Sequence, residues 1–136
     1  MILNDQPFKN STITSILVVN DMSKSLQFYL NVLGAELINE YGGTSAVLKF
    51  LNHWILLVTE GGPTADKPDI SFEAIKNSDA VNHSFTIRVE NCNMTYTILK
   101  NRGAKFITPP YNWRKEIRCF FKDPNGHLFE ISEIPS

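Results

Sequence analysis

Hydrophobic and polar residues along this chain follow two periods in turn, and each change of period predicts a new element. Residues 13–19 are rich in β-branched side chains and predict a strand that ends at Asn20 and Asp21. Apolar residues then recur at helical spacing from Met22 until Gly34, which favours a helix stop. Three short apolar runs divided by turn residues predict an antiparallel meander, over residues 35–41, 45–51 and 54–59. Residues from about 13 to 60 therefore predict a β-α-β-β-β unit, module one.

The second half of the chain repeats this order of elements. Val19 and Val89 lie 70 positions apart and Gly34 and Gly103 lie 69 apart, so the two halves stay in register. A second unit, module two, is predicted over about 83–133, with a strand, a helix and three strands at 84–89, 92–102, 105–108, 116–121 and 127–132. A nearly constant offset of this size is typical of a duplicated supersecondary unit.

Residues 61–82, between the modules, form the least patterned part of the chain. They begin with Gly61, Gly62 and Pro63, and their scattered apolar residues predict either a short helix or an extended arm that packs on a neighbour. We therefore expect a single domain over 1–136, made of module one, this connection and module two. A protein of two like units is expected to place its ligand site where the units meet.

Composition and charge mainly exclude classes of partner and cellular location. The formal charge is -1 and the Lys and Arg residues are scattered, so we expect no nucleic-acid partner and no membrane partner. Cys92 and Cys119 stand in different segments and match no metal-binding spacing. The N-terminal residues lack a basic stretch followed by an apolar core, and no apolar run approaches the roughly 18 residues of a membrane span. A reduced, cytoplasmic protein is expected.

Two motifs in matching places carry a family resemblance. The first runs from Asn20 to Tyr29 (NDMSKSLQFY) and the second from Asp123 to Ile131 (DPNGHLFEI). With the duplicated βαβββ order, these motifs make the region from about residue 13 to residue 133 resemble the vicinal oxygen chelate superfamily. That group includes glyoxalase I, extradiol dioxygenases, fosfomycin-resistance enzymes and bleomycin-resistance proteins. The resemblance implies an α+β fold in which two tandem βαβββ modules form a curved eight-stranded mixed sheet with a cavity on its concave side.

The resemblance also implies the places where many relatives hold a divalent metal, on the first and last strands of each module. The matching positions here are Thr14, Leu56, Ser84 and Glu130. A metal at this point would need oxygen and imidazole donors that converge, and Glu130 is the one competent ligand of the four. We therefore expect these residues to line a ligand cavity without a metal or other cofactor.

His83 leaves an alternative open, because it is next to Ser84 and relatives commonly have histidine on this strand. Strand alternation places His83 on the face of Phe85, under the helix, and Ser84 on the opposite face with Glu130. A bulge near Asn82 would reverse this assignment. The alternative is a divalent metal (Ni, Zn, Mn or Fe) held by His83 and Glu130.

Further candidates for the cavity wall are Arg88, Arg118 and Trp113. The two arginines either receive an anionic group of a ligand or are ordinary exposed strand residues, and the indole either lines the cavity or packs in the core. Glu130, if buried away from cations, would have a raised pKa and would serve as a catalytic general base. His53 and His127 stand in or beside turns and are expected to be solvated.

Three classes of function fit these residues. The first is a binding module similar to the bleomycin-resistance proteins, which captures a small molecule between its modules without the full family metal site. The second is a metal-dependent lyase or dioxygenase that uses His83 and Glu130, and the third is a regulatory domain whose groove engages another protein. Whether the protein is an enzyme stays open at this point. Because relatives commonly pair two chains, a homodimer is expected.

Overall fold

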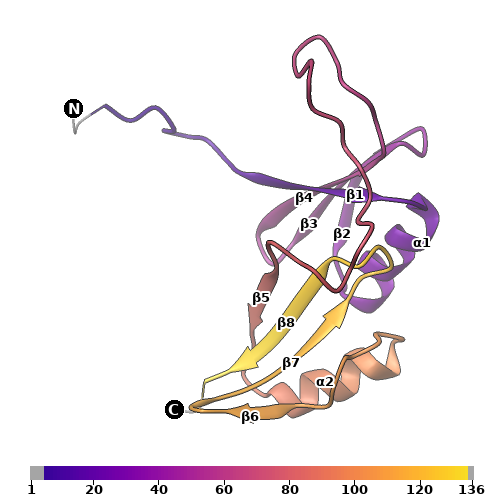
Figure 1. The fold of residues 1–136 in the computed structure, drawn as a ribbon. Helices are drawn as coiled ribbons and strands as arrows, with labels where there is room; N and C mark the ends of the chain where they lie inside the picture. The colour runs from indigo at the N-terminus through magenta and orange to yellow at the C-terminus, as the bar shows by residue number, and fades with distance from the viewer. Residues whose placement is uncertain (1–4, 135–136) are drawn as a thin grey trace.

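The computed structural model describes residues 5–134 and contains two βαβββ modules that follow each other along the chain (Figure 1). Module one consists of β1 (Thr14–Val19), α1 (Met22–Gln27), η1 (Phe28–Val32), β2 (Glu36–Tyr41), β3 (Ser45–Phe50) and β4 (His53–Thr59). Module two consists of β5 (Phe85–Arg88), α2 (Cys92–Asn101), β6 (Tyr111–Trp113), β7 (Glu116–Lys122) and β8 (Leu128–Glu133). The predicted tandem architecture is confirmed.

The eight strands are divided between two four-stranded mixed sheets with the same topology. Their orders are β1-β4-β3-β2 and β5-β8-β7-β6. In each sheet the first strand of the module runs parallel to the last, and the other neighbours are antiparallel. This repetition puts β1 and β5 at the edges of their sheets, where the two modules approach each other.

Alternation along the strands gives each sheet one face that packs against the helices and one face that points away from them. Leu17 and Val19 of β1 and Phe129 and Ile131 of β8 are buried, and they belong to a core that both modules share. The helices cover this buried face, and we call the opposite face of each sheet its inner face. Because alternate residues of a strand point to opposite faces, burial of one set under the helices places the other set on the inner face.

The first helix begins as the sequence predicts but changes its winding. Asp21 caps it, because its Oδ1 accepts a hydrogen bond from Lys24 N at 3.1 Å. Instead of one continuous α-helix, a π-helical turn follows, in which Leu33 N donates to Phe28 O at 3.2 Å. Gly34 then ends the helix at φ +78°, a backbone conformation that favours glycine. No helix within residues 5–134 is long and apolar enough to cross a membrane.

The predicted strand at 105–108 is wrong. Phe106 forms only an isolated bridge with Phe121, and the strand β6 lies farther along, at Tyr111–Trp113. Pro109 and Pro110 separate the two places, and proline cannot donate to a sheet ladder, so regular pairing with β7 begins only after them. Module two therefore has a short outer strand.

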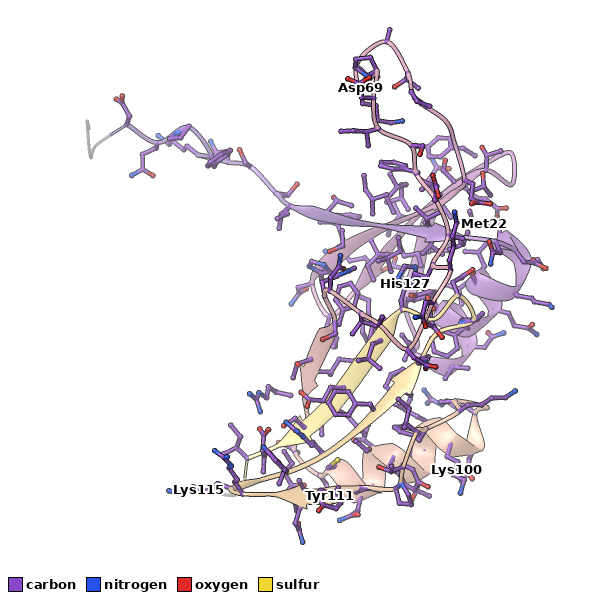
Figure 2. All side chains as sticks on the ribbon, in the orientation of Figure 1. Met22, Asp69, Lys100, Tyr111, Lys115 and His127 are labelled. Carbon is purple, nitrogen blue, oxygen red and sulfur yellow. The ribbon has the colours of Figure 1, made fainter. Side chains whose placement is uncertain are left out.

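Of the two forms predicted for the connection, the structure shows the extended one. Residues 61–82 contain no helix, and Gly61 pairs with Phe72 in an isolated antiparallel bridge. The connection rises away from module one, with Asp69 near its tip, and returns along the junction between the modules (Figures 1 and 2). Its returning part lies beside the start of β8 before the chain enters β5.

The turn between β7 and β8 joins module two to module one. Asp123 Oδ2 accepts a hydrogen bond from Tyr29 OH at 2.6 Å, and burial, followed by the nearby Asp123 carboxylate, raises the pKa of Tyr29 well above its ordinary value. Asn125 Oδ1 accepts from Asn20 N at 2.7 Å, and Asn125 Nδ2 donates to Ser25 Oγ at 2.8 Å. The two family motifs therefore contact each other directly and fix how the modules meet.

Candidate functional site

Glu130 lies in the middle of β8 on the inner face of module two. The sheet pairs it with Thr86 of β5, whose Oγ1 donates a hydrogen bond to Glu130 Oε1 at 2.9 Å. Glu130 Oε2 lies 3.7 Å from Arg118 Nη1, and the residue is 8% exposed. The general-base hypothesis required a Glu130 carboxylate buried away from cations, and the position of Arg118 does not meet this condition.

Glu116, at the start of β7, connects the two arginines of this inner face. It accepts hydrogen bonds from Arg88 Nη1 and Ser132 Oγ, each at 3.0 Å, and lies 3.4 Å from Arg118 Nη1. The hydrogen bond from Arg88, followed by the one from Ser132, holds the pKa of Glu116 below its ordinary value of 4.5. Both arginines thus have carboxylate partners. Our sequence reasoning missed Glu116, although alternation along β7 places it on the face of Arg118.

Trp113 of β6 extends the same face with a half-exposed indole. The Arg118 guanidinium carbon lies 5.0 Å from the centre of the Trp113 ring and 5.5 Å from that of Phe120, within the range of cation–π contacts. Arg118 therefore lies between a carboxylate and two aromatic rings. The structure brings Glu130, Arg118 and Trp113 together, with Arg88 joined to them through a shared carboxylate.

Thr14, Leu56 and Ser84 lie in other places. Thr14 is exposed at the start of β1, and Leu56 of β4 is paired with Ile16 on the largely apolar inner face of module one. Ser84 lines a pocket of about 400 Å³ between the β3–β4 turn and the edge strand β5, together with Arg88. No pocket found within residues 5–134 contains all four positions that the resemblance implies.

The side chains at the family positions do not fit a divalent metal. Two are hydroxyls and one is aliphatic, which leaves Glu130 as the single carboxylate. The positive guanidinium of Arg118, 3.7 Å from that carboxylate, opposes a second cation there. Among the described residues, no three His, Cys, Asp or Glu side chains gather closely enough to hold a metal ion. The donor set itself is therefore unsuited to the chemistry of metal-bearing relatives.

His83 lies just before β5, which begins at Phe85, so strand alternation does not fix its side chain. Its ring packs edge to face on Phe85, with 5.7 Å between centroids, and its Nδ1 lies 3.5 Å from Asn82 Oδ1. His83 lines a pocket between the modules that Glu130 does not line. The geometry places the two residues of the alternative metal site in different surroundings.

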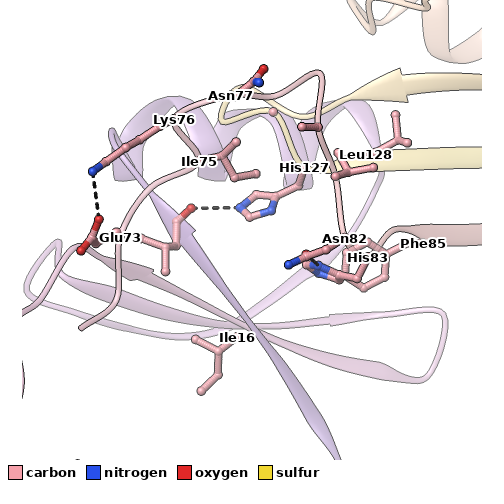
Figure 3. Close-up of a pocket in the computed structure, with 14 residues that line it drawn as sticks. Ile16, Glu73, Ile75, Lys76, Asn77, Asn82, His83, Phe85, His127 and Leu128 are labelled. Carbon is pink, nitrogen blue, oxygen red and sulfur yellow. Dashed lines mark hydrogen bonds and ion pairs between the residues drawn. The ribbon is translucent and has the colours of Figure 1, made fainter. Parts of the chain in front are cut away.

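This inter-module pocket has a volume of about 420 Å³ and lies under the returning part of the connection (Figure 3). Its walls come from β1, the connection, the start of β5 and the β7–β8 turn. The apolar wall is formed by Ile16, Val18, Ile75, Val81, Phe85 and Leu128. The polar groups are Glu73, Lys76, Asn77, Asn82, His83 and His127. A largely apolar hollow with a few polar groups is typical of small-molecule sites.

The connection is fixed over this pocket by contacts with module two. Lys122 Nζ donates to Asp79 Oδ1 at 2.9 Å and to Ser78 Oγ at 3.1 Å. Gly126, at φ +93°, lies so close to the connection that a Cβ atom there would be 2.6 Å from Ser78 Cβ. Glycine is therefore required at this turn position both for its conformation and for the close approach. Together these contacts make the connection a wall of the pocket.

His127 is a buried member of the pocket and not the solvated turn residue that we expected. It is 7% exposed, its backbone N donates to Asp123 Oδ1 at 2.8 Å, and its Nε2 lies 3.0 Å from the Val18 carbonyl oxygen. Its Nδ1 is buried and is the one such side-chain atom among the described residues without a hydrogen-bond partner. The prediction failed because a turn pattern does not show what packs on the turn. In Figure 2, His127 lies at the junction of the modules.

Two other arrangements resemble parts of nucleophilic sites. Ser15 Oγ and His53 Nε2 are 2.9 Å apart, but within residues 5–134 no carboxylate hydrogen-bonds to the other nitrogen of His53, so the pair lacks the orienting group of a triad. Burial raises the pKa of Cys119 to about 12 and also raises that of Cys92. Both thiols are therefore protonated at neutral pH and are weak nucleophiles.

Comparisons with known proteins agree with the observed fold. The family model described as Glyoxalase/Bleomycin resistance protein/Dioxygenase superfamily matches residues 11–131. A glyoxalase/bleomycin resistance protein/dioxygenase from Alicyclobacillus acidocaldarius is 16% identical with a TM-score of 0.71, and the match covers 96% of each chain. A lactoylglutathione lyase from Agrobacterium tumefaciens is 17% identical with a TM-score of 0.67, covering 90% of this chain and 92% of that one. The fosfomycin resistance protein FosX from Listeria monocytogenes, solved with Mn(II) and dihydroxypropylphosphonic acid, is 19% identical with a TM-score of 0.66, covering 89% and 88%.

Proposed function

Because the chain belongs to the glyoxalase/bleomycin resistance protein/dioxygenase superfamily, we propose that it binds a small organic molecule in the inter-module pocket without a metal ion at the family positions. The observation that carries this proposal is the pocket itself, whose walls come from both modules and from the connection. Its volume of about 420 Å³ falls in the range of roughly 300 to 1,000 Å³ that is usual for ligand sites.

The charges around the pocket favour a ligand without a net charge. Glu73 and Lys76 at its rim form an ion pair at 3.2 Å, so neither sign dominates there. Asn82 and His83 are near each other at the opposite rim, and the interior wall is apolar. Because burial of an unpaired ligand charge against such a wall would be costly, the site fits a compact, neutral molecule.

The chemistry of the surrounding groups favours binding over catalysis. Glu130 is engaged by Thr86 and Arg118, the Ser15–His53 pair lacks an orienting carboxylate among the described residues, and both cysteines are protonated. We therefore propose that the ion network on the inner face of module two holds β5, β7 and β8 together. A sequestering or carrier role follows, in which the ligand leaves unchanged.

A ligand screen that uses pocket-filling variants tests this proposal. A library of neutral fragments is screened by two-dimensional NMR of the ¹⁵N-labelled protein, and hits are expected to shift resonances of the inter-module pocket. Ala80→Trp fills the pocket from its exposed rim and should abolish binding, whereas the matched control Ala65→Trp, on an exposed part of the connection outside the pocket, should not. Hits that survive Ala80→Trp, or no hit at the pocket, would contradict the proposal.

Elemental analysis tests the metal-free part of the proposal separately. Protein purified without a histidine tag is expected to contain far less than one metal ion per chain. Near-stoichiometric Ni, Zn, Mn or Fe that is lost in both His83→Ala and Glu130→Gln would instead establish the metal-dependent lyase or dioxygenase alternative. The donor chemistry described above is the reason to expect the first result.

We also propose that two chains associate as a homodimer. Phe8 and Ile13, on the extended segment before β1, are 82% and 79% exposed, and Ile16 follows on an edge strand of its sheet. Exposed apolar side chains beside a free strand edge favour association. Analytical ultracentrifugation should show a dimer that Ile13→Asp weakens and the control Ile107→Asp, in module two, does not. A wild-type monomer at micromolar concentration would contradict this.

A further inference from the structure

We propose that an open groove between the helices of the two modules binds the phosphate group of a small molecule. The groove lies on the side of the molecule where both helices are found in Figure 1, and it shares no lining residue with the inter-module pocket. The proposal therefore concerns a second site and does not depend on the proposed function. It rests on the charges of the helices, the lining of the groove and the position of Arg102.

The helical segments of both modules contain no carboxylates. Of the 14 Asp and Glu residues of the chain, none lies within residues 22–35 or within residues 91–115. The charged side chains on and just after the helices are all cationic, and they are Lys24, Lys100, Arg102 and Lys105. The net charge of -1 therefore does not describe this part of the molecule, which has an excess of positive charge and attracts anions.

The groove has a volume of about 450 Å³ and combines cations, amides and a small apolar surface. Lys24, Gln27 and Asn31 follow one another at helical spacing along α1 and η1, and Arg102 lines the groove from the end of α2. The apolar part is formed by Phe28, Val32 and Pro124. No Asp or Glu within residues 5–134 lines the groove. One wall is the π-helical turn η1, and such turns are frequent at functional sites.

A hydrogen bond to module one holds Arg102 at the groove. Arg102 Nη1 donates to the Val32 carbonyl oxygen at 3.2 Å, which joins the end of α2 to the end of η1. A guanidinium has five N–H donors, and this bond uses one of them. Neither Arg102 nor Lys24 forms an ion pair with a carboxylate within residues 5–134. Both cations can therefore bind an anion from solution without losing a carboxylate partner.

The carboxylates that are nearest along the chain are engaged in other contacts. Asp21 Oδ1 accepts the hydrogen bond from Lys24 N that caps α1. Asp123, next to Pro124, is 5% exposed and accepts hydrogen bonds from Tyr29 OH and from two backbone N–H groups. Neither carboxylate lines the groove, so neither occupies the place of an anion there.

The donor set fits a phosphate group better than a carboxylate. A phosphate monoester has a charge of about -1.5 to -2 at neutral pH and three acceptor oxygens, which match two cations and further N–H donors. Lys24 and Arg102 supply the two cations, and Gln27 and Asn31 add neutral amides. The guanidinium fork also matches the geometry of phosphate oxygens. The apolar surface beside these groups favours a phosphate that belongs to an organic molecule over free phosphate.

Titrations followed by two-dimensional NMR of the ¹⁵N-labelled full chain, at neutral pH and constant ionic strength, test the proposal. Phenyl phosphate and inorganic phosphate should both shift resonances of residues 24–32 and of Arg102 and should saturate. Phenyl phosphate should bind roughly threefold more tightly, because its ring covers the apolar surface. Acetate, with one charge and two oxygens, should not saturate over the same concentrations. Equal saturation by acetate, or no saturable shift with phosphate, would overturn the phosphate site, and equal affinities for the two phosphates would overturn the preference for an organic phosphate.

Two variants and a matched control separate a built site from general attraction to the helices. Lys24→Gln and Arg102→Gln should each weaken phenyl phosphate by about fivefold. In the control Lys100→Gln the change should stay within about 1.5-fold, because Lys100, labelled on α2 in Figure 2, lies outside the groove with its Nζ 5.5 Å from the Tyr96 ring centre. Lys24 is exposed and its side chain has no partner to lose, so its variant stays informative even if Arg102→Gln disturbs the contact between the modules. Equal losses in Lys24→Gln and Lys100→Gln would show diffuse attraction and would overturn the site.

Discussion

The turns before the last strand of each module occupy equivalent places in the duplication but have different surroundings. In module one, Leu51 is 67% exposed, and His53 hydrogen-bonds to Ser15 of its own module while its ring packs on Phe85 of module two, with 6.5 Å between centroids. In module two, Asn125 and His127 are 8% and 7% exposed and bond to the other module. The duplicated unit therefore has one turn that is largely exposed and one that is buried and hydrogen-bonded to the other module. This asymmetry explains why the inter-module pocket lies at the second turn.

The inner faces of the two modules also differ, in their polarity. The inner face of module one is largely apolar, with Leu56 paired between Ile16 and Val47. The inner face of module two carries the network of Glu116, Glu130 and their arginine partners. The polar network therefore belongs to module two alone, whereas the apolar wall of the pocket comes from both modules, through Ile16 and Val18 of β1 and Phe85 and Leu128 of module two.

Asp123→Ala should be the most damaging change. It removes the acceptor for Tyr29 OH and for two backbone N–H groups, at 2.6 to 2.9 Å, and leaves these donors buried without partners. We expect a loss of about 4 kcal/mol in the free energy of unfolding, measured by urea denaturation. Asp69→Ala, at the tip of the connection, is the control and should change it by less than about 0.5 kcal/mol. Equal effects in the two variants would refute the assignment of the second turn as the module junction.

Gly126→Ala should have the next largest effect. The new Cβ would lie 2.6 Å from Ser78 Cβ, at a backbone φ of +93°. We expect a loss of about 3 kcal/mol, of which about 1 is backbone strain. Ser78→Gly in the same chain should recover the steric part, because it removes the clashing atom. Gly43→Ala, at φ +76° with no atom within 4 Å, isolates the backbone part. If Ser78→Gly restores nothing, the connection does not rest on the turn as described.

The order of elements could be predicted from the sequence, whereas details that depend on packing could not. Alternation and helical spacing gave seven of the eight strands and both helices, because hydrophobic burial imposes those periods. The eighth strand was misplaced to 105–108, since an apolar run does not show where Pro109 and Pro110 allow pairing to begin. The π-helical turn at Phe28–Val32 has the same apolar spacing as an α-helix over so short a length, so periodicity does not reveal it.

The candidate site was predictable only where strand alternation decides orientation. Alternation places Thr86, Glu130 and Arg118 on one face once the pairing of β5, β8 and β7 is known, but that pairing comes from the fold. The ion pairs of Glu116 depend on register between strands, and the burial of His127 depends on the arrival of a different module. The local sequence predicts neither the ion pairs nor the burial. The ion pairs change the chemistry available to Glu130, and the burial of His127 changes the chemistry of the pocket wall.

The network on module two should make stability depend on acid, with a smaller effect than the two changes above. The folded pKa of Glu116 lies below 4.5, so its stabilising contribution is fully present above that pH and is lost as the pH falls through the folded pKa. In a double-mutant cycle with Arg88→Gln and Glu116→Gln, the coupling should be largest near neutral pH and should vanish in acid. Urea denaturation at several pH values measures it. A coupling that is constant with pH would contradict the ion pair.

Leu51→Gly should have the smallest effect, and the opposite sign. Leu51 adopts φ +51°, which costs a branched L-residue about 1 kcal/mol and glycine almost nothing. Glycine loses more backbone entropy on folding, which offsets part of the gain, so we expect stabilisation by about 0.5 kcal/mol. A differential scanning calorimetry melt compared with wild type checks this. If the variant is instead destabilised by more than about 1 kcal/mol, the exposed turn of module one carries a contact of its own. Both turns would then make contacts that stabilise the fold, and they would differ only in how much free energy of unfolding those contacts contribute.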